Sequence, residues 1–180
     1  MKFIYFMILS LLYFSILKQP IKIENSYKVE FVYDNDIIKT IDKELIYNKI
    51  KNFMQYRHKS EITAIWTDCI YLASKKWKLD YTLLISVIKH ESSFNNKAIS
   101  SVGAKGSMQV MWSVWGDKLI ENNICEVESD LYDINKGIDA GCFVLKHYIE
   151  KYGDVEIGLQ RYFGVCSYSS IYSSKILNNM

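Results

Sequence analysis

From residue 61 to the C-terminus, apolar residues recur every three or four positions, which is the period of one face of an α-helix. Asp80, Asp133 and Asp154 precede such stretches, where a carboxylate accepts hydrogen bonds from the first helical N–H groups. Gly153 follows one stretch and is suited to end it. This part of the chain is therefore expected to be mainly α. The predicted helices cover residues 61–78, 81–91, 108–112, 114–122, 133–152, 154–163 and 167–177.

The first 20 residues show a different pattern, an apolar run with no polar face. Residues 3–17 are apolar except for two serines, and Lys2 and Lys18 flank the run. A run of this length is short for a membrane-spanning helix and matches the hydrophobic region of a secretory signal. We predict that residues 1–20 are a signal peptide or a membrane anchor, and both cleavage and anchoring stay open. Either outcome implies export to the periplasm or another part of the cell envelope.

Residues 21–60 carry weaker patterns and are predicted to be a spacer with weak local structure. Residues 27–33 alternate enough between apolar and polar to form a strand. Asp42 is predicted to cap a helix that runs to about residue 56. The expected organisation is a signal or anchor over 1–20, a spacer over 21–60 and one folded domain over 61–180.

Composition narrows the possible classes of protein. With 180 residues, 49% of them hydrophobic, the chain is long enough to bury one sizeable core. The formal net charge is +2 and both signs are interspersed, so no electrostatic footprint for nucleic acid is present. The cysteines form no CxxC pair and have no histidine at metal-ligand spacing, so no metal site is expected. In an oxidising compartment three pairings into two disulfides are open to Cys69, Cys125, Cys142 and Cys166.

One carboxylate falls on an apolar helix face. Leu84, Val87, Ile88 and Glu91 occupy relative positions 0, 3, 4 and 7, which lie on one side of a helix. A carboxylate in apolar surroundings loses hydration, and this raises its pKa toward the range in which it donates a proton. Glu91 is therefore a candidate general acid. The alternative is that Glu91, in the last turn of its helix, reaches water or a structural partner.

A glycine-punctuated loop follows Glu91. Gly103 and Gly106 bracket this loop, which lacks the Gly-Lys-Ser/Thr ending of a phosphate-binding loop and by itself indicates a turn. The order of features is more specific: an apolar helix, Glu-Ser, Ser-x-Phe-Asn, then Ser-x-x-Gly-Ala-x-Gly-x-Met-Gln-Val-Met. This order resembles the catalytic domain of lytic transglycosylases of the soluble-lytic-transglycosylase (SLT) type, which has a lysozyme-like fold. The resemblance extends from about Glu61 to the C-terminus.

Later segments extend the resemblance and depart from it at single positions. The long predicted helix keeps Asp133, Ile138, Gly141 and Leu145 of a family pattern, and the segment GLQRYFG keeps a family tyrosine at Tyr162. None of the departures involves Glu91. The departures are Ser107 for a leucine, Trp112 and Ile134 for prolines, and Gly137 and Phe163 for asparagines.

The resemblance implies a mainly α, lysozyme-like domain with a catalytic cleft. In such enzymes a lone glutamate, here Glu91, protonates the oxygen of the β-1,4 bond between N-acetylmuramic acid and N-acetylglucosamine. The acetamido group of the substrate stabilises the sugar cation, and the same glutamate then takes the proton of the muramic C6 hydroxyl, which leaves a 1,6-anhydro end. By matching position, the residues implied to line the glycan groove are Ser100, Gly106, Gln109, Met111 and Tyr162, with Ser92 orienting Glu91 by a hydrogen bond.

Two other functions stay open from the sequence. A hydrolytic muramidase needs a second carboxylate, for which Asp117, Glu121, Asp130 and Asp133 are candidates, although each is more simply a solvated or capping residue. A catalytically silent wall-binding or scaffold module is the other alternative. No cofactor is expected, because acid–base chemistry needs none. The expected partners are peptidoglycan glycan strands, and secretion or conjugation machinery is a further option. Contact with the membrane is expected only through the N-terminal segment, and no nucleic-acid partner is expected.

Overall fold

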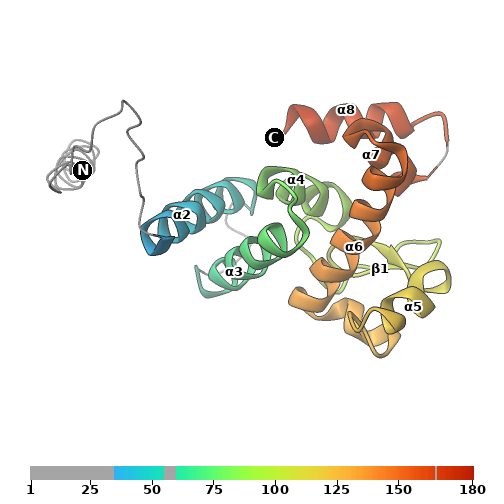
Figure 1. Ribbon diagram of the computed structural model, residues 1–180, viewed down its shortest axis with the longest axis horizontal. Coiled ribbons are helices and arrows are strands. Elements are labelled where there is room, and N and C mark those ends of the chain that lie inside the picture. Colours follow the sequence, from blue (N-terminus) through green and yellow to red (C-terminus); the bar gives the residue numbers. More distant parts are fainter. Residues whose placement is uncertain (1–34, 55–59, 165) are drawn as a thin grey trace, which may run out of the picture. The chain divides into compact units, whose positions relative to one another are not determined.

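The computed structural model describes residues 35–54, 60–164 and 166–180. The predicted signal or anchor over 1–20 and the predicted strand over 27–33 lie outside the described residues. Within the described ranges, no helix combines the length and the apolar character that crossing a membrane requires. Seven α-helices, one short 3-10 helix and a two-stranded sheet make up this part of the chain (Figure 1). The prediction of a mainly α domain is confirmed.

The first described helix, α2, spans Asn35–Met54 and begins earlier than predicted. Asp42 does not cap it: Asp42 lies inside the helix, where its carboxylate binds the Lys75 amine at 2.8 Å. Ile46 and Ile50 of α2 are fully buried in the main hydrophobic core. This helix belongs to the same compact unit as the rest of the described chain, so residues predicted to be a spacer contribute to the core.

Helices α3 (Ser60–Trp77) and α4 (Tyr81–Ser92) follow the predicted boundaries closely. Asp80 caps α4 as predicted, because its Oδ1 accepts a hydrogen bond from the Thr82 N–H at 2.6 Å. The six consecutive residues Leu83 to Ile88 are all buried. A helix that is buried on all sides is a core helix, so α4 lies at the centre of the fold, with α2, α3 and α8 packed against it (Figure 1).

The predicted helix over 108–112 is wrong, because residues 108–111 form the end of the turn and the second strand of a β-hairpin, and Trp112 begins the next helix. Strand β1 (Ala104–Lys105) pairs antiparallel with β2 (Val110–Met111), with Ala104 opposite Met111. Gly106 and Gln109 have φ angles of 78° and 53°, and these left-handed backbones interrupt any helix between the strands. Helix α5 (Trp112–Glu121) then starts directly after β2, two residues earlier than predicted.

The long helix α6 (Ile134–Tyr152) follows a 3-10 helix, η1 (Glu128–Tyr132). It contributes buried residues to two hydrophobic clusters. Asp133 caps it by accepting from the Lys136 N–H at 2.9 Å, and Gly153 ends it with a φ of 68°, both as predicted. Its residues Ile138, Cys142 and Leu145 belong to the main core, whereas Ala140 and Val144 belong to a second cluster with α5 and the hairpin.

Two shorter helices complete the fold. Helix α7 (Val155–Phe163) is capped by Asp154, whose Oδ1 accepts from the Ile157 N–H at 2.8 Å, as predicted. The last helix, α8 (Ser169–Asn178), confirms the prediction for the C-terminal segment and packs against both α7 and α4 (Figure 1).

The cysteines are all free thiols, so none of the three disulfide pairings is present. Cys125 and Cys142 are buried, Cys69 is half-buried and Cys166 is exposed. Burial raises the pKa of Cys69 and of Cys125 to about 11, and it raises the pKa of Cys142, fully inside the core, well above its ordinary 9.0. These three thiols therefore stay protonated and act as small apolar side chains.

Candidate active site

Glu91 is the penultimate residue of α4 and lies half-buried at the end of its apolar face. Leu84, Val87 and Ile88, which share that face, are fully buried, as the spacing predicts. One oxygen of the carboxylate, Oε1, accepts a hydrogen bond of 2.5 Å from the hydroxyl of Tyr172 on α8. The alternative was that Glu91 reaches water or a structural partner, and the Tyr172 hydroxyl is a partner of this kind.

The surroundings of Glu91 shift its protonation. Burial raises the pKa of Glu91 from an ordinary 4.5 to about 7, while the hydrogen bond from Tyr172 acts in the opposite direction. Burial is the larger effect, because it disfavours the charged form more than one donor stabilises it. Near neutral pH the side chain can therefore both donate and accept a proton, which is the property of a general acid and base.

The chain turns sharply just after Glu91. Ser93 and Phe94 both adopt left-handed backbone conformations, with φ angles of 51° and 62°, which are uncommon for residues other than glycine. Phe94 is only 2% exposed, and its ring meets the ring of Trp66 edge-on at 5.2 Å between centroids. The burial of Phe94 offsets the cost of this turn, which ends the helix directly beside the carboxylate.

Ser92 connects α4 to the hairpin. Its hydroxyl donates to the Ser107 carbonyl oxygen at 2.8 Å and lies 3.3 Å from the Ile88 carbonyl oxygen. The predicted hydrogen bond from Ser92 to Glu91 is thus replaced by one to the loop. The hydroxyl that contacts Glu91 is that of Tyr172.

Tyr162, on α7, binds the same loop segment as Ser92. Its hydroxyl donates to the Met108 carbonyl oxygen at 2.5 Å. Burial raises the pKa of Tyr162 well above its ordinary value, and the negative charge of Glu91 adds to this effect. Met108 itself is fully buried against Gly141 of α6, where an added Cβ would lie 2.4 Å from the Met108 Cβ.

The predicted groove residues Ser100 and Gln109 hold the loop together. The Ser100 hydroxyl oxygen accepts from the Ala104 N–H at 3.0 Å. The Gln109 side-chain amide donates to the carbonyl oxygens of Ala98 at 3.2 Å and Gly106 at 3.0 Å. Both side chains are half-buried. They shape the loop that lies in sequence between Glu91 and α5.

Gly106 and Met111 complete the predicted groove set. Gly106 is buried, and a Cβ there would lie 2.0 Å from the Leu131 carbonyl oxygen, so glycine is required by the close approach of η1. A Cβ added at Gly137 would lie 2.5 Å from the same Leu131 oxygen. This close approach explains why the asparagine of the family pattern is absent at this position. Met111 is half-buried at the end of β2.

The structure thus brings Tyr162 and Ser92, the residue next to Glu91, to residues 107–108, with Ser100, Gly106 and Gln109 in the adjoining loop and hairpin. Sequence reasoning missed Tyr172, and also Phe163 as its neighbour, whose ring stacks on that of Tyr172. Tyr172 lies 81 positions from Glu91, and no local pattern signals a contact over that separation.

Two of the four candidate second carboxylates have other partners. Asp130 accepts from the Glu126 N–H at 2.7 Å and pairs with the Lys136 amine at 3.1 Å, and Asp133 caps α6. Asp117 and Glu121 are exposed on α5.

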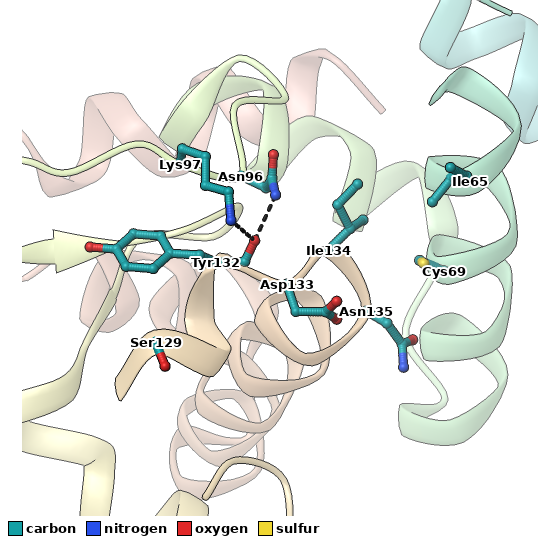
Figure 2. Close-up of a pocket in the computed structure, with 9 residues that line it drawn as sticks. All are labelled: Ile65, Cys69, Asn96, Lys97, Ser129, Tyr132, Asp133, Ile134 and Asn135. Atoms are coloured by element: carbon teal, nitrogen blue, oxygen red, sulfur yellow. Dashed lines mark hydrogen bonds between the residues drawn. The ribbon is translucent and has the colours of Figure 1, made fainter. Parts of the chain in front are cut away.

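A pocket of about 440 Å³ lies elsewhere, between α3, the turn after α4, and the junction of η1 with α6 (Figure 2). The Asn96 amide and the Lys97 amine both donate to the Tyr132 carbonyl oxygen, at 2.6 and 3.2 Å (Figure 2). Neither Glu91 nor any predicted groove residue lines this pocket. It is therefore separate from the candidate active site.

Comparison with known proteins gives consistent results. The family described as the transglycosylase SLT domain matches residues 68–176. A transglycosylase of Enterobacteria phage PRD1 is 33% identical over 99 residues, which are 55% of this chain and 34% of the phage protein. This chain therefore spans about a third of the length of that curated relative.

Solved structures agree on the fold. An inactive mutant of the lytic transglycosylase Slt of Pseudomonas aeruginosa has a TM-score of 0.50 at 16% identity, covering 83% of this chain and 25% of that one. The complex of a 70-kDa soluble lytic transglycosylase with bulgecin A has a TM-score of 0.51 at 15% identity, covering 89% and 33%. Since the family match covers more than half of the chain, the protein belongs to the transglycosylase SLT domain family.

Proposed function

We propose that the chain is a peptidoglycan lytic transglycosylase, which cleaves the β-1,4 bond between N-acetylmuramic acid and N-acetylglucosamine and leaves 1,6-anhydromuramic ends. The observation that carries the proposal is the half-buried Glu91 carboxylate, whose pKa is raised to about 7 and whose Oε1 is held by Tyr172 at 2.5 Å. Membership of the family supports it independently.

The proposed reaction uses Glu91 twice. Protonated Glu91 first donates to the glycosidic oxygen, so that the bond from muramic C1 to this oxygen breaks and N-acetylglucosamine leaves with its hydroxyl. The acetamido carbonyl of the substrate stabilises the cationic C1. The ionised Glu91 then accepts the proton of the muramic C6 hydroxyl while its oxygen bonds to C1. The proton returns to Glu91, so no water is consumed and the site is ready for another cycle.

The groove residues are proposed to bind the glycan. Hydroxyl and amide groups of Ser100 and Gln109 suit sugar hydroxyl and N-acetyl groups, whereas Met111 and Tyr162 offer surfaces for sugar faces. Gly106 keeps the loop close to its neighbours. Ser92 is proposed to fix the end of α4 through Ser107, which keeps Glu91 in register with the loop.

A hydrolytic muramidase is the nearest alternative, and it requires a carboxylate that activates water opposite the acid. Asp130 and Asp133 already bind other groups, which favours the single-acid reaction over that alternative. The catalytically silent module is disfavoured by the raised pKa of Glu91, because a purely structural carboxylate gains nothing from such desolvation. Action in the cell envelope, where peptidoglycan lies, completes the proposal and includes export through residues 1–20.

Mass spectrometry of digested peptidoglycan tests the proposal. Muropeptides with 1,6-anhydro ends are expected. Reducing ends, heavier by one water, would refute transglycosylation and assign a muramidase, and unchanged peptidoglycan together with glycan binding would assign a silent binding module.

A further inference from the structure

The hydrogen bond between Tyr172 and Glu91 is a direct polar contact between the acid and another helix. Tyr172 is 7% exposed, and its hydroxyl lies 2.5 Å from Glu91 Oε1. A hydroxyl can donate to an ionised carboxylate more strongly than to a neutral one, so this contact stabilises the charged form of Glu91. Its strength depends on how firmly the Tyr172 ring is held.

The ring of Phe163 packs on one face of the Tyr172 ring. The Phe163 and Tyr172 rings are stacked, with 4.5 Å between their centroids and 18° between their planes. Phe163 is the last residue of α7 and is 44% exposed, so part of its side chain faces solvent while its ring lies on that of Tyr172. Such a stack restrains both the position and the tilt of the Tyr172 ring.

Helix α8 is fixed around Tyr172 at further points. Ile176, one turn later, is fully buried in the core. The Ser173 hydroxyl lies 3.3 Å from both the Gln160 amide and the Glu156 carboxylate of α7. These contacts hold the backbone of α8, and Tyr172 itself is buried in the main core, so the stack with Phe163 is a further restraint on its ring.

We propose that Tyr172 is a positioning residue for the acid Glu91 and that Phe163 acts through Tyr172 by holding its ring in place. The inference rests on the proposed function only for its consequence in catalysis, since the contact itself acts on the carboxylate with or without substrate. Loss of the Tyr172 hydroxyl, or of the stack that aims it, leaves the ionised carboxylate less stabilised. Glu91 then ionises at higher pH.

Other titratable groups of α4, α7 and α8 lie around this contact. Tyr162 comes from α7, Lys175 from α8, and His90 from α4 itself, with its ring 6.3 Å from that of Tyr172. Burial and the charges of Lys175 and Lys89 hold the pKa of His90 below its ordinary 6.5. Tyr162 and Tyr172 have pKa values raised well above 10. The carboxyl signal that Glu91→Gln removes therefore has to be followed, because it reports the ionisation of Glu91 itself.

The test is a carbon-13 NMR titration of the Glu91 carboxyl in the full chain, with the signal assigned from its loss in Glu91→Gln. Tyr172→Phe keeps the ring and removes only the hydroxyl, and we expect the midpoint to rise by about one pH unit. Phe163→Leu keeps an apolar side chain and removes the stack, and we expect a smaller rise. The double variant should titrate as Tyr172→Phe does, because Phe163 acts through that hydroxyl.

Tyr132→Phe is the matched control, since it removes a hydroxyl from a half-buried tyrosine beside the separate pocket (Figure 2), and it should titrate as the parent chain does. An unchanged midpoint in Phe163→Leu, or additive shifts in the double variant, would overturn the proposal. If Tyr172→Phe does not fold, Phe163→Leu alone decides. The titration needs no catalytic turnover, so its failure differs from the failure of the proposed function, which the product analysis reveals.

Discussion

Glu91→Gln is expected to change how the free energy of unfolding depends on pH. The pKa of Glu91 is about 7 in the folded chain against an ordinary 4.5, so the folded state binds the proton more tightly than the unfolded state. The stability that this group contributes is fully present below about pH 4.5 and is lost as the pH rises through 7. A shift of this size corresponds to about 3 kcal/mol.

Glutamine has nearly the same shape, stays neutral and offers an oxygen to the Tyr172 hydroxyl. Glu91→Gln should therefore match the parent chain near pH 4.5 and exceed its free energy of unfolding by about 3 kcal/mol near pH 8.5. Urea unfolding at a series of pH values measures the difference. Glu121→Gln, which removes an exposed carboxylate of α5, is the control and should follow the parent curve. Parallel curves for Glu91→Gln and the parent chain would refute the burial argument.

Three further predictions concern the packing of α6 against Met108, the cap of α6, and the pH dependence of glycan cleavage. Gly141→Ala should lower the free energy of unfolding by about 1–3 kcal/mol in urea, because the new Cβ overlaps Met108; unchanged stability would contradict this packing. Asp133→Ala should cost about 1 kcal/mol in the same assay through loss of the α6 cap, and an Asp133→Asn variant that retains an acceptor should recover most of it. In the parent chain kcat/KM for glycan cleavage should fall as the pH rises above about 7, because Glu91 must begin protonated, and a flat profile up to pH 9 would argue against this role.

The main helices could be predicted from the sequence because their signals are local. Asp80, Asp133 and Asp154 all cap the predicted helices, since a short carboxylate side chain reaches only the first helical N–H groups. The burial of Glu91 was also predictable, because helical spacing places it on the face of Leu84. Signals of this kind depend only on neighbours within one or two turns.

Features set by tertiary contacts were not predictable. The segment from Met108 to Trp112 has apolar residues compatible with one helix, yet the left-handed backbone of Gln109 and the pairing of β2 with β1 interrupt it. Asp42 has the side chain of a helix cap, but α3 offers it Lys75, and the helix continues through it. The position of Tyr172 depends on how α8 packs against α4 and α7, and no sequence period encodes this packing.

Glycan cleavage by Glu91→Gln is the measurement that tests the central claim most directly. A buried glutamine cannot deliver a proton to the glycosidic oxygen, so release of anhydro-muropeptides should fall by at least about a hundredfold. Sedimentation with insoluble peptidoglycan should show that the variant still binds the glycan. Release at the rate of the parent chain would contradict the assignment of Glu91 as the acid.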